Sequence, residues 1–201
     1  MNLHLLYAIF IGYILGSIPF ALVIGKVFYH TDIRKFGSGN LGGTNAGRVL
    51  GKNAAIAVIA LDVLKVVLAV FLVSLFDQPA SIWAGFAAAF GHCYPIFANF
   101  KGGKAAATMF GFLLSTAIFT FQSPWYVLVP FLFFILTLKL SKMVSLSSII
   151  GSITSSIFIT IMQDNLQITI ASYLLCILVI YRHRENIQRI RNGNESKITW
   201  L

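Results

Sequence analysis

Long apolar stretches alternate with short polar segments along the whole chain. Because a helix needs about 20 mostly apolar residues to cross a bilayer, the longer stretches are candidate membrane spans. Seven candidates run over residues 5–28, 53–76, 80–97, 105–121, 125–138, 146–162 and 168–181. Several of them are short, and Pro130 interrupts the fifth, so tilted or kinked helices are expected there.

The composition supports this pattern and excludes a water-soluble fold. Of the 201 residues, 58% are hydrophobic and 10% are charged, against roughly 45–50% and about 25% in an average soluble domain. The pattern therefore predicts an all-α integral membrane protein that forms one domain over residues 1–201. The polar residues 182–201 are expected to form a short cytoplasmic tail.

The distribution of positive charge predicts the orientation of the chain. If the N-terminus lies outside, nearly all of the 15 lysines and arginines fall in the segments on the inner side. The outer turns, around residues 77–79, 122–124 and 164–167, contain none. Because cytoplasmic loops accumulate Lys and Arg, we expect about seven spans, an outer N-terminus and a cytoplasmic C-terminus.

The first polar segment, residues 37–48, is rich in glycine. It reads Gly-Ser-Gly-Asn-Leu-Gly-Gly-Thr-Asn-Ala-Gly-Arg, and glycines let the backbone approach a ligand so that successive amides can bind an anion. The guanidinium of Arg48 suits phosphate oxygens. The segment is therefore predicted to bind phosphate, although glycine is also common in flexible loops between helices. The candidate side chains and backbone positions are Ser38, Gly39, Asn40, Asn45 and Arg48.

A second glycine-rich segment lies at residues 91–108. Gly102 and Gly103 stand directly before Lys104 and an apolar stretch, which predicts free amides and a cation at the start of a helix. Like a phosphate loop, the segment has glycines and a lysine directly before a helix, but it lacks the spacing of that motif. His92 is expected to be a structural hydrogen-bonding residue rather than a base.

The third polar segment follows the last apolar stretch. His183 and Asn186 are three residues apart, so on a continuing helix they share one face that can look into an active site. The same cluster of basic residues is also typical of an anchor at an anionic membrane surface.

Polar residues inside the apolar stretches have simpler interpretations. Asp62 and Lys65 are expected to pair as a structural brace, because isolated charges are costly in a membrane. Small hydroxyls often serve helix packing, so Ser145 is of interest only for its position beside the inner loops. The six acidic residues are scattered, so no metal site and no cofactor are expected.

Together these motifs resemble those of the bacterial acyl-phosphate-dependent glycerol-3-phosphate acyltransferases, the PlsY type. The resemblance covers essentially the whole chain and rests on three motifs in order: Gly-Ser-Gly-Asn…Thr-Asn…Arg at 37–48, Gly-His…Pro…Phe-Lys-Gly-Gly-Lys…Ala-Thr at 91–108, and Arg-His-Arg-Glu-Asn-Ile with a later Gly…Glu…Lys at 182–197.

The resemblance implies a seven-helix enzyme of the bacterial inner membrane whose active site faces the cytoplasm. It transfers a fatty acyl group from acyl phosphate to the 1-hydroxyl of glycerol 3-phosphate, which gives 1-acylglycerol 3-phosphate (lysophosphatidic acid) and phosphate. The implied partners are these substrates and membrane lipids, with no nucleic acid. The implied catalytic residues are Ser38, His183 and Asn186, and the substrate-binding residues are Gly39, Asn40, Asn45, Arg48, Gly102, Gly103, Lys104 and Ser145.

Three alternatives stay open at this point. The reaction can proceed by direct attack of the glycerol hydroxyl, with Ser38 and His183 orienting groups. His183 can instead act as general base, or Ser38 can act as a covalent nucleophile. A transporter of a phosphorylated metabolite also needs cationic inner loops, although such folds often contain repeats that are not evident here. A lipid-binding scaffold without catalytic activity would not require two anion-binding loops.

Overall fold

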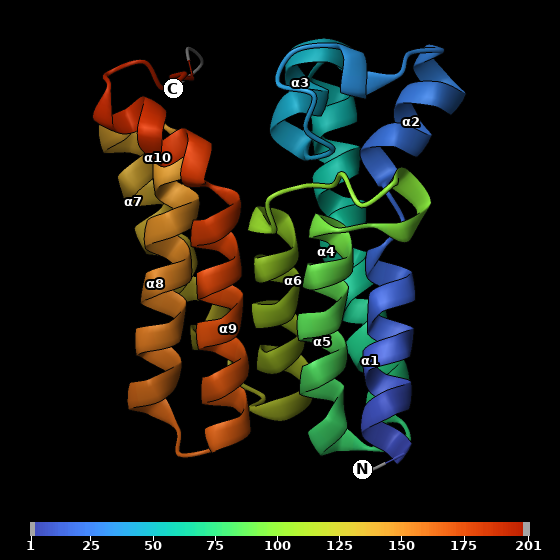
Figure 1. Ribbon diagram of the computed structural model, residues 1–201. Helices are drawn as coiled ribbons and strands as arrows, with labels where there is room; N and C mark the ends of the chain where they lie inside the picture. Colours follow the sequence, from blue (N-terminus) through green and yellow to red (C-terminus); the bar gives the residue numbers. More distant parts are fainter. Residues whose placement is uncertain (1–2, 199–201) are drawn as a thin grey trace.

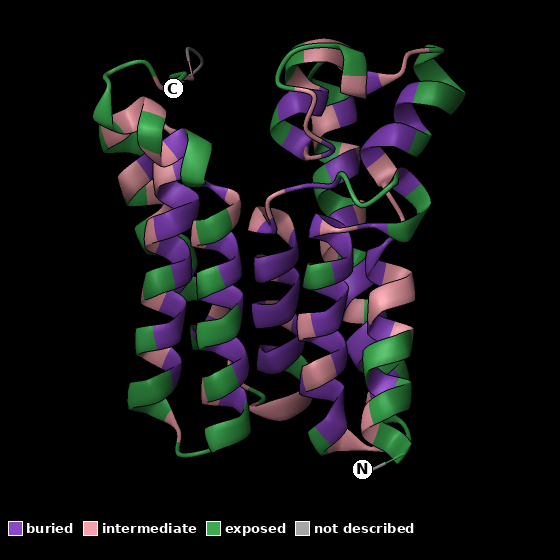
Figure 2. Cartoon of the chain, viewed as in Figure 1, coloured by how far each residue is buried: buried purple, intermediate pink, exposed green. Residues whose placement is uncertain are grey.

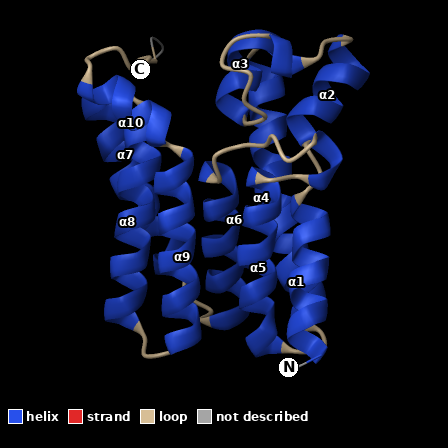
Figure 3. Cartoon of the chain, in the orientation of Figure 1, coloured by secondary structure: helices blue, strands red, loops and turns tan. Residues whose placement is uncertain are grey.

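The computed structural model describes residues 3–198, and within this range every regular element is a helix (Figures 1 and 3). Short 3₁₀ turns lie at Ile33–Lys35 and Ile96–Ala98, and a π-helical turn at Thr116–Thr120 extends α6. The main helices are α1 (Leu3–Gly16), α2 (Phe20–Tyr29), α3 (Gly43–Leu50), α4 (Lys52–Ser74), α5 (Gln78–Cys93), α6 (Ala106–Ser115), α7 (Trp125–Ser141), α8 (Val144–Met162), α9 (Leu166–Arg182) and α10 (Arg184–Arg191).

The long helices lie side by side, and the polar segments gather at one end of them (Figure 1). Helix α1 packs on α5, α4 packs on both α5 and α6, and α7 packs on α8. Helices α2, α3 and α10 lie at the upper end in Figure 1, whereas the described chain starts at the lower end. The three polar segments singled out by sequence are thereby brought to the same end of the bundle.

The helices agree with an integral membrane protein. Three stretches are long and apolar enough to cross a membrane, namely Lys52–Ser74, Val144–Met162 and Leu3–Tyr29, which comprises α1 and α2. A bent pair, α9 with α10, would make a fourth. Large apolar side chains such as Leu140 and Ile161 are 79% and 75% exposed, and exposed residues recur along the long helices (Figure 2). Lipid, rather than water, is the environment that suits such a surface. The number of spans and their orientation remain predictions.

The first apolar stretch is two helices rather than one. Helix α1 ends at Gly16 and α2 begins at Phe20, with Pro19 at the position before it. Proline lacks the N–H that would continue the ladder, and at this break the carbonyl of Ile18 accepts a 3.0 Å hydrogen bond from Nζ of Lys65. Pro130, in contrast, does not interrupt α7, which runs unbroken from Trp125 to Ser141.

Helices α1 and α5 pack closely because α1 carries glycine at two positions four residues apart. A Cβ atom at Gly12 would fall on the carbonyl oxygen of Ala84, and one at Gly16 on that of Ala88. Small residues at this spacing let two helix backbones approach in a membrane. This contact fixes the position of α5, whose last turn carries His92.

The C-terminal segment, residues 182–198, folds back on the bundle, whereas its predicted location in the cytoplasm stays a prediction; residues 199–201 lie outside the described range. The chain bends by 57° between α9 and α10 and then returns toward the bundle. The amide of Ile198 donates a 2.8 Å hydrogen bond to the carbonyl of Lys142, between α7 and α8. The tail therefore covers the end of α8 and contributes to the site below it.

Candidate active site

A cavity of about 360 Å³ lies where the three polar segments meet. Its size is within the range of small-molecule sites. Eight of the predicted site residues line it, and they come from all three segments and from α8: Ser38, Asn40, Asn45, Arg48, Lys104, Ser145, His183 and Asn186. The other three, Gly39, Gly102 and Gly103, do not line it, and their binding of substrate stays a prediction.

The first segment is organised by the side chain of Asn45. Its Oδ1 accepts a 2.9 Å hydrogen bond from the amide of Ser38, and its Nδ2 donates to the carbonyls of Phe36 and Ile33. The amide of Gly39 donates to Phe36 as well, in a turn where Gly39 has a φ of +68°. These two amides are used inside the loop, and anion binding by other amides of residues 37–48 stays a prediction.

Arg48 belongs to a helix rather than to the predicted loop. Helix α3 begins at Gly43, so the guanidinium of Arg48 is carried on its last turn. Gly43 packs so closely on α4 that a Cβ atom would meet the side chain of Ile59. The glycine thus allows α3 to lie against α4 and to present Arg48 to the cavity.

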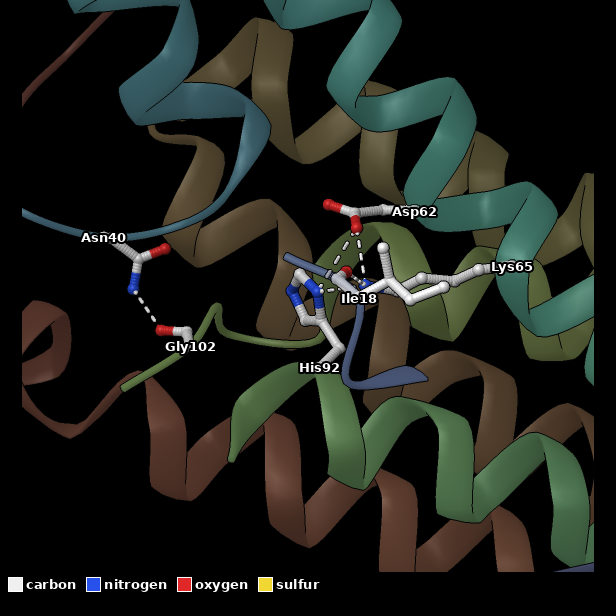
Figure 4. A network of polar contacts seen from close by, with 6 residues as sticks. All are labelled: Ile18, Asn40, Asp62, Lys65, His92 and Gly102. Carbon is white, nitrogen blue, oxygen red and sulfur yellow. Dashed lines mark hydrogen bonds and ion pairs between the residues drawn. The ribbon is translucent and has the colours of Figure 1, made fainter. Parts of the chain in front are cut away.

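The glycines of the second segment serve close packing on α5. The amide of Gly103 donates a 2.9 Å hydrogen bond to the carbonyl of His92, and a Cβ atom at Gly103 would fall on the imidazole ring of His92. The carbonyl of Gly102 accepts hydrogen bonds from Nδ2 of Asn40 at 3.2 Å (Figure 4) and from Arg182 at 3.1 Å. These two glycines therefore tie all three polar segments together.

A chain of hydrogen bonds crosses the cavity wall from Lys104 to the C-terminal segment. Nζ of Lys104 donates to Oδ1 of Asn186 at 2.6 Å, and Nδ2 of Asn186 donates to Oε1 of Glu195 at 2.6 Å. The same carboxylate accepts from Ser145 Oγ and from Arg189 Nε, each at 2.7 Å. All five residues line the cavity, which makes this wall a continuous set of polar groups.

These contacts set the charges of the wall. Burial opposes the charge of Glu195, but the hydrogen bonds from Ser145, Asn186 and Arg189 outweigh it and lower the pKa of the carboxyl. Burial, with the nearby charge of Arg189, lowers the pKa of the Lys104 ammonium. A bound anion would favour the charged form of Lys104, because an opposite charge nearby stabilises it.

His183 lies at the bend between α9 and α10, not within a continuing helix. Its Nδ1 is 2.8 Å from the carbonyl oxygen of Val179 and must therefore carry the hydrogen, which leaves Nε2 as an acceptor. Burial lowers the pKa of His183 to about 4. The ring is consequently neutral near pH 7 and can accept a hydrogen bond from a ligand.

Asp62 and Lys65 are paired as predicted, and His92 joins them (Figure 4). Nζ of Lys65 is 2.7 Å from Oδ1 of Asp62 and 3.1 Å from Nδ1 of His92. All three side chains are buried, with at most 5% exposed. The structural role predicted for His92 fits this geometry, yet both His92 and Asp62 line the cavity.

The remaining wall of the cavity is apolar. Phe110 of α6 meets Phe131 and Phe134 of α7 edge-on, with ring centroids 5.7 and 5.5 Å apart. Ile59 of α4 and Val144 of α8 complete this side. One cavity therefore combines cationic and hydrogen-bonding groups with a surface that suits a hydrocarbon chain.

Four cavity residues with titratable side chains were not among the predicted site residues, namely Asp62, His92, Arg189 and Glu195. Arg189 had been interpreted as an orientation signal at the membrane surface, but it pairs with Glu195 at 2.7 Å. Its spacing of three residues from Asn186 could have indicated a shared helix face. Among residues 3–198, no group of three or more His, Cys, Asp or Glu side chains is placed to hold a metal ion.

Comparisons with known proteins give consistent matches over the full length. The sequence matches the family model for glycerol-3-phosphate acyltransferase over residues 6–193. It is 46% identical to the glycerol-3-phosphate acyltransferase of Geobacillus kaustophilus (strain HTA426), covering 94% of each chain. It is 44% identical to that of Listeria monocytogenes serovar 1/2a (strain ATCC BAA-679 / EGD-e), covering 100% of each.

Two crystal structures of PlsY (YgiH), an integral membrane glycerol 3-phosphate acyltransferase, are similar to the fold. The glycerol 3-phosphate form has a TM-score of 0.89 at 34% identity, covering 97% of this chain and 96% of that one. The lysophosphatidic acid form has a TM-score of 0.87 at 33% identity, with 97% and 95% covered.

Proposed function

The chain belongs to the glycerol-3-phosphate acyltransferase family and is an acyltransferase, and from that premise we propose how its cavity performs the reaction. A fatty acyl group passes from acyl phosphate to the 1-hydroxyl of glycerol 3-phosphate. The products are 1-acylglycerol 3-phosphate and inorganic phosphate. This is the first acylation of phospholipid synthesis. The transporter alternative has no support from the relatives reported above, which are all named acyltransferases.

The observation that carries the proposal is that one cavity has both a cationic wall and an apolar wall. The cations Arg48 and Lys104 lie on the same cavity as the aromatic rings of Phe110, Phe131 and Phe134. An acyl phosphate has both a phosphate and an apolar chain, and glycerol 3-phosphate brings a second phosphate. A site for both substrates must offset the repulsion between two anionic groups and still accept a hydrocarbon chain.

The substrate phosphates bind to Arg48 and Lys104 in this proposal. Guanidinium and ammonium groups form charge-assisted hydrogen bonds with phosphate oxygens, and Ser38 and Ser145 add neutral hydroxyl donors beside them. Asn186 orients Lys104 through their 2.6 Å hydrogen bond. Asn40 and Asn45 act through the loop geometry that they hold, since their amides bond to backbone groups.

The acyl transfer itself proceeds by direct attack. The C1 hydroxyl oxygen forms a bond to the acyl carbon, the bond from that carbon to the phosphate oxygen breaks, and the departing phosphate takes the hydroxyl proton. A mixed anhydride has a good leaving group, so positioning and charge stabilisation supply the main acceleration. The low pKa of His183, about 4, makes its ring a weak base and favours an orienting role.

Two experiments separate the mechanisms. Rapid quenching followed by mass spectrometry would detect an acylated Ser38; finding that species at a competent rate would replace direct attack with the covalent route. If Ser38→Ala keeps most of the wild-type rate, the covalent route is excluded. Thr44→Ala is a matched control, because Thr44 is another hydroxyl on the same cavity.

The donor is tested with purified protein and radiolabelled glycerol 3-phosphate. Palmitoyl phosphate should give labelled lysophosphatidic acid, whereas palmitoyl-CoA and palmitoyl acyl carrier protein should give none. Product from a thioester but not from the acyl phosphate would overturn the proposed donor. Absence of product from every donor, with protein shown to be folded, would overturn the enzymatic proposal.

The active site faces the cytoplasm of a bacterial inner membrane in this proposal, with seven spans and an outer N-terminus. The concentration of Lys and Arg at the cavity end supports this orientation. Single cysteines at Lys101 and Gln122, introduced after both native cysteines are replaced, test it. A membrane-impermeant maleimide added to intact spheroplasts should label position 122 only, and labelling of position 101 would reverse the topology.

A further inference from the structure

One buried oxygen on the cavity wall has no partner. Oδ1 of Asp62 is held by Lys65 at 2.7 Å, but no hydrogen bond or ion pair from residues 3–198 reaches Oδ2. Figure 4 shows the contacts of Asp62 on one oxygen while the other points away from Lys65 and His92. Asp62 is 1% exposed, so ordinary solvent does not surround it.

The neighbouring side chains cannot supply the missing donor. The ammonium of Lys65 has three N–H groups, and it meets three acceptors: Asp62 Oδ1, the carbonyl of Ile18 and Nδ1 of His92. Nδ1 of His92 lies 3.1 Å from Nζ of Lys65 and 3.4 Å from Oδ1 of Asp62, and Nε2 packs against Gly103, so neither ring nitrogen is bonded to Oδ2. The donors of the buried cluster are thus already used.

A buried carboxylate oxygen without a donor is costly, and such exceptions in folded proteins usually have a functional reason. Since Asp62 lines the same cavity as Arg48 and Lys104, a ligand in that cavity can provide the donor. Lys65 balances the charge of the carboxylate, which limits its repulsion of a nearby phosphate.

We infer that Asp62 accepts a hydrogen bond from the C2 hydroxyl of glycerol 3-phosphate and thereby helps to select this acceptor. The inference rests on the proposed function. Each of the other polar groups of the acceptor has a place in the reaction: the phosphate goes to the cations, and the C1 hydroxyl goes to the acyl carbonyl. The C2 hydroxyl is the donor that remains, and it too would be left unpaired in a desolvated site.

This contact gives the acceptor three fixed points. The phosphate, the C1 hydroxyl and the C2 hydroxyl stand on a tetrahedral carbon framework, and in the mirror-image molecule the C2 hydroxyl points away when the other two are in place. Asp62 is therefore a residue that determines stereospecificity, in addition to contacting substrate. A site that hydrogen-bonds a substrate hydroxyl rejects analogues that lack it, because its own polar group is then unpaired.

The test compares two enzymes, wild type and variant, with two acceptors that differ only in the C2 hydroxyl. Wild type and Asp62→Asn are assayed with palmitoyl phosphate and either glycerol 3-phosphate or 3-hydroxypropyl phosphate, which keeps the reacting hydroxyl but lacks the C2 hydroxyl. Loss of that hydroxyl should lower kcat/KM of the wild type by about tenfold or more. In Asp62→Asn, removal of the C2 hydroxyl from the acceptor should lower kcat/KM by about twofold or less. Discrimination against the mirror-image acceptor should fall in parallel.

A second variant covers the case in which Asp62→Asn fails to fold. The pair Asp62→Leu with Lys65→Met removes both buried charges together, which is often tolerated where removal of one is not; it should also lose the preference for the C2 hydroxyl. Asp164→Asn, an exposed aspartate on an outer turn, is the matched control and should behave as wild type.

The outcomes separate the inference from the function on which it rests. If the variants retain the full penalty for loss of the C2 hydroxyl, Asp62 has a structural role only and the inference is overturned. Equal kcat/KM of the wild type for the two acceptors overturns it without any variant. If the wild type acylates neither acceptor from any donor, the proposed function fails, and the inference falls with it.

Discussion

Nζ of Lys104 donates a 2.6 Å hydrogen bond to Oδ1 of Asn186, although the two residues are 82 positions apart in the sequence. The bond joins the second glycine-rich segment to helix α10. It sets the direction of a half-buried ammonium group, and it makes the position of Lys104 dependent on the C-terminal segment. The first prediction concerns this lysine.

Lys104→Ala should lower kcat/KM for glycerol 3-phosphate by about tenfold to hundredfold, mainly through a higher KM. The expected size follows from the loss of charge-assisted hydrogen bonds to phosphate, about 1.5–3 kcal/mol. Steady-state kinetics at saturating acyl phosphate measure the effect. Lys101→Ala is the matched control, because Lys101 lies on the same segment but is exposed and does not line the cavity. Equal kinetics of the two variants would remove Lys104 from the site.

Arg48→Lys should fail to restore the wild-type rate even though it keeps the charge. The planar guanidinium binds two phosphate oxygens at once, whereas an ammonium is a point charge. We expect KM for glycerol 3-phosphate to rise at least about fivefold, since one charge-assisted contact is lost. Lys52→Arg, an exposed position just beyond α3, controls for general effects of surface charge. A wild-type KM in Arg48→Lys would mean that only charge matters there.

Glu195→Gln should loosen the C-terminal segment. The amide keeps the shape of the side chain but removes its charge and one of its two accepting oxygens, and Arg189 and Asn186 each donate to a different oxygen. Limited proteolysis after residue 191 should become about tenfold faster, which corresponds to roughly 1.4 kcal/mol. Glu185→Gln is the control, because Glu185 is exposed on the preceding helix α10. Unchanged cleavage in Glu195→Gln would show that other contacts hold the segment.

The imidazole of His183 should stay neutral down to about pH 4, the pKa set mainly by its burial. An unfolded chain takes up this proton near pH 6.5, so between these values only the unfolded state binds it and stability declines as pH falls. Nitrogen-15 NMR of labelled histidine rings in micelles measures the titration, and the missing signal of His183→Gln assigns it. A midpoint near 6.5 for this ring would contradict the prediction.

Gly103→Ala should destabilise the fold and lower activity together. The added methyl group would fall on the ring of His92, which is buried and held near Lys65 through Nδ1. Overpacking of this kind costs about 1–3 kcal/mol, which lowers the unfolding midpoint in detergent by about 3 to 10 °C. Gly151→Ala in α8 is the control, because its nearest neighbour would lie 3.5 Å away. Retention of the wild-type midpoint would mean that His92 can shift.

The chemistry of the site could be predicted from the sequence because each motif carries its own residues. Arg48, Lys104 and His183 were identified as candidates, and the structure places them on a single cavity. The partners of those residues could not be predicted. Ser145 and Glu195 are 50 positions apart, and Lys65 and His92 are 27 apart, so nothing local in the sequence indicates which groups meet.

The limits of pattern reasoning are also visible in the helices. Hydropathy cannot reveal that Pro19 divides the first apolar stretch, whereas Pro130 is accommodated inside α7, because the outcome depends on what neighbouring helices offer the freed carbonyls. Gly102 and Gly103 were predicted to approach a ligand. Their close approach to His92 shows that the same freedom from a side chain serves packing against α5.

The carboxylate of Glu195 gives the empty cavity an anion of its own. It occupies hydrogen-bond donors on Ser145, Asn186 and Arg189 before any substrate arrives. Loading a phosphate there is consequently an exchange, in which donors pass from an internal anion to an incoming one, rather than a simple addition to bare cations. Such an exchange moderates affinity for phosphate and thereby favours release of inorganic phosphate, the product.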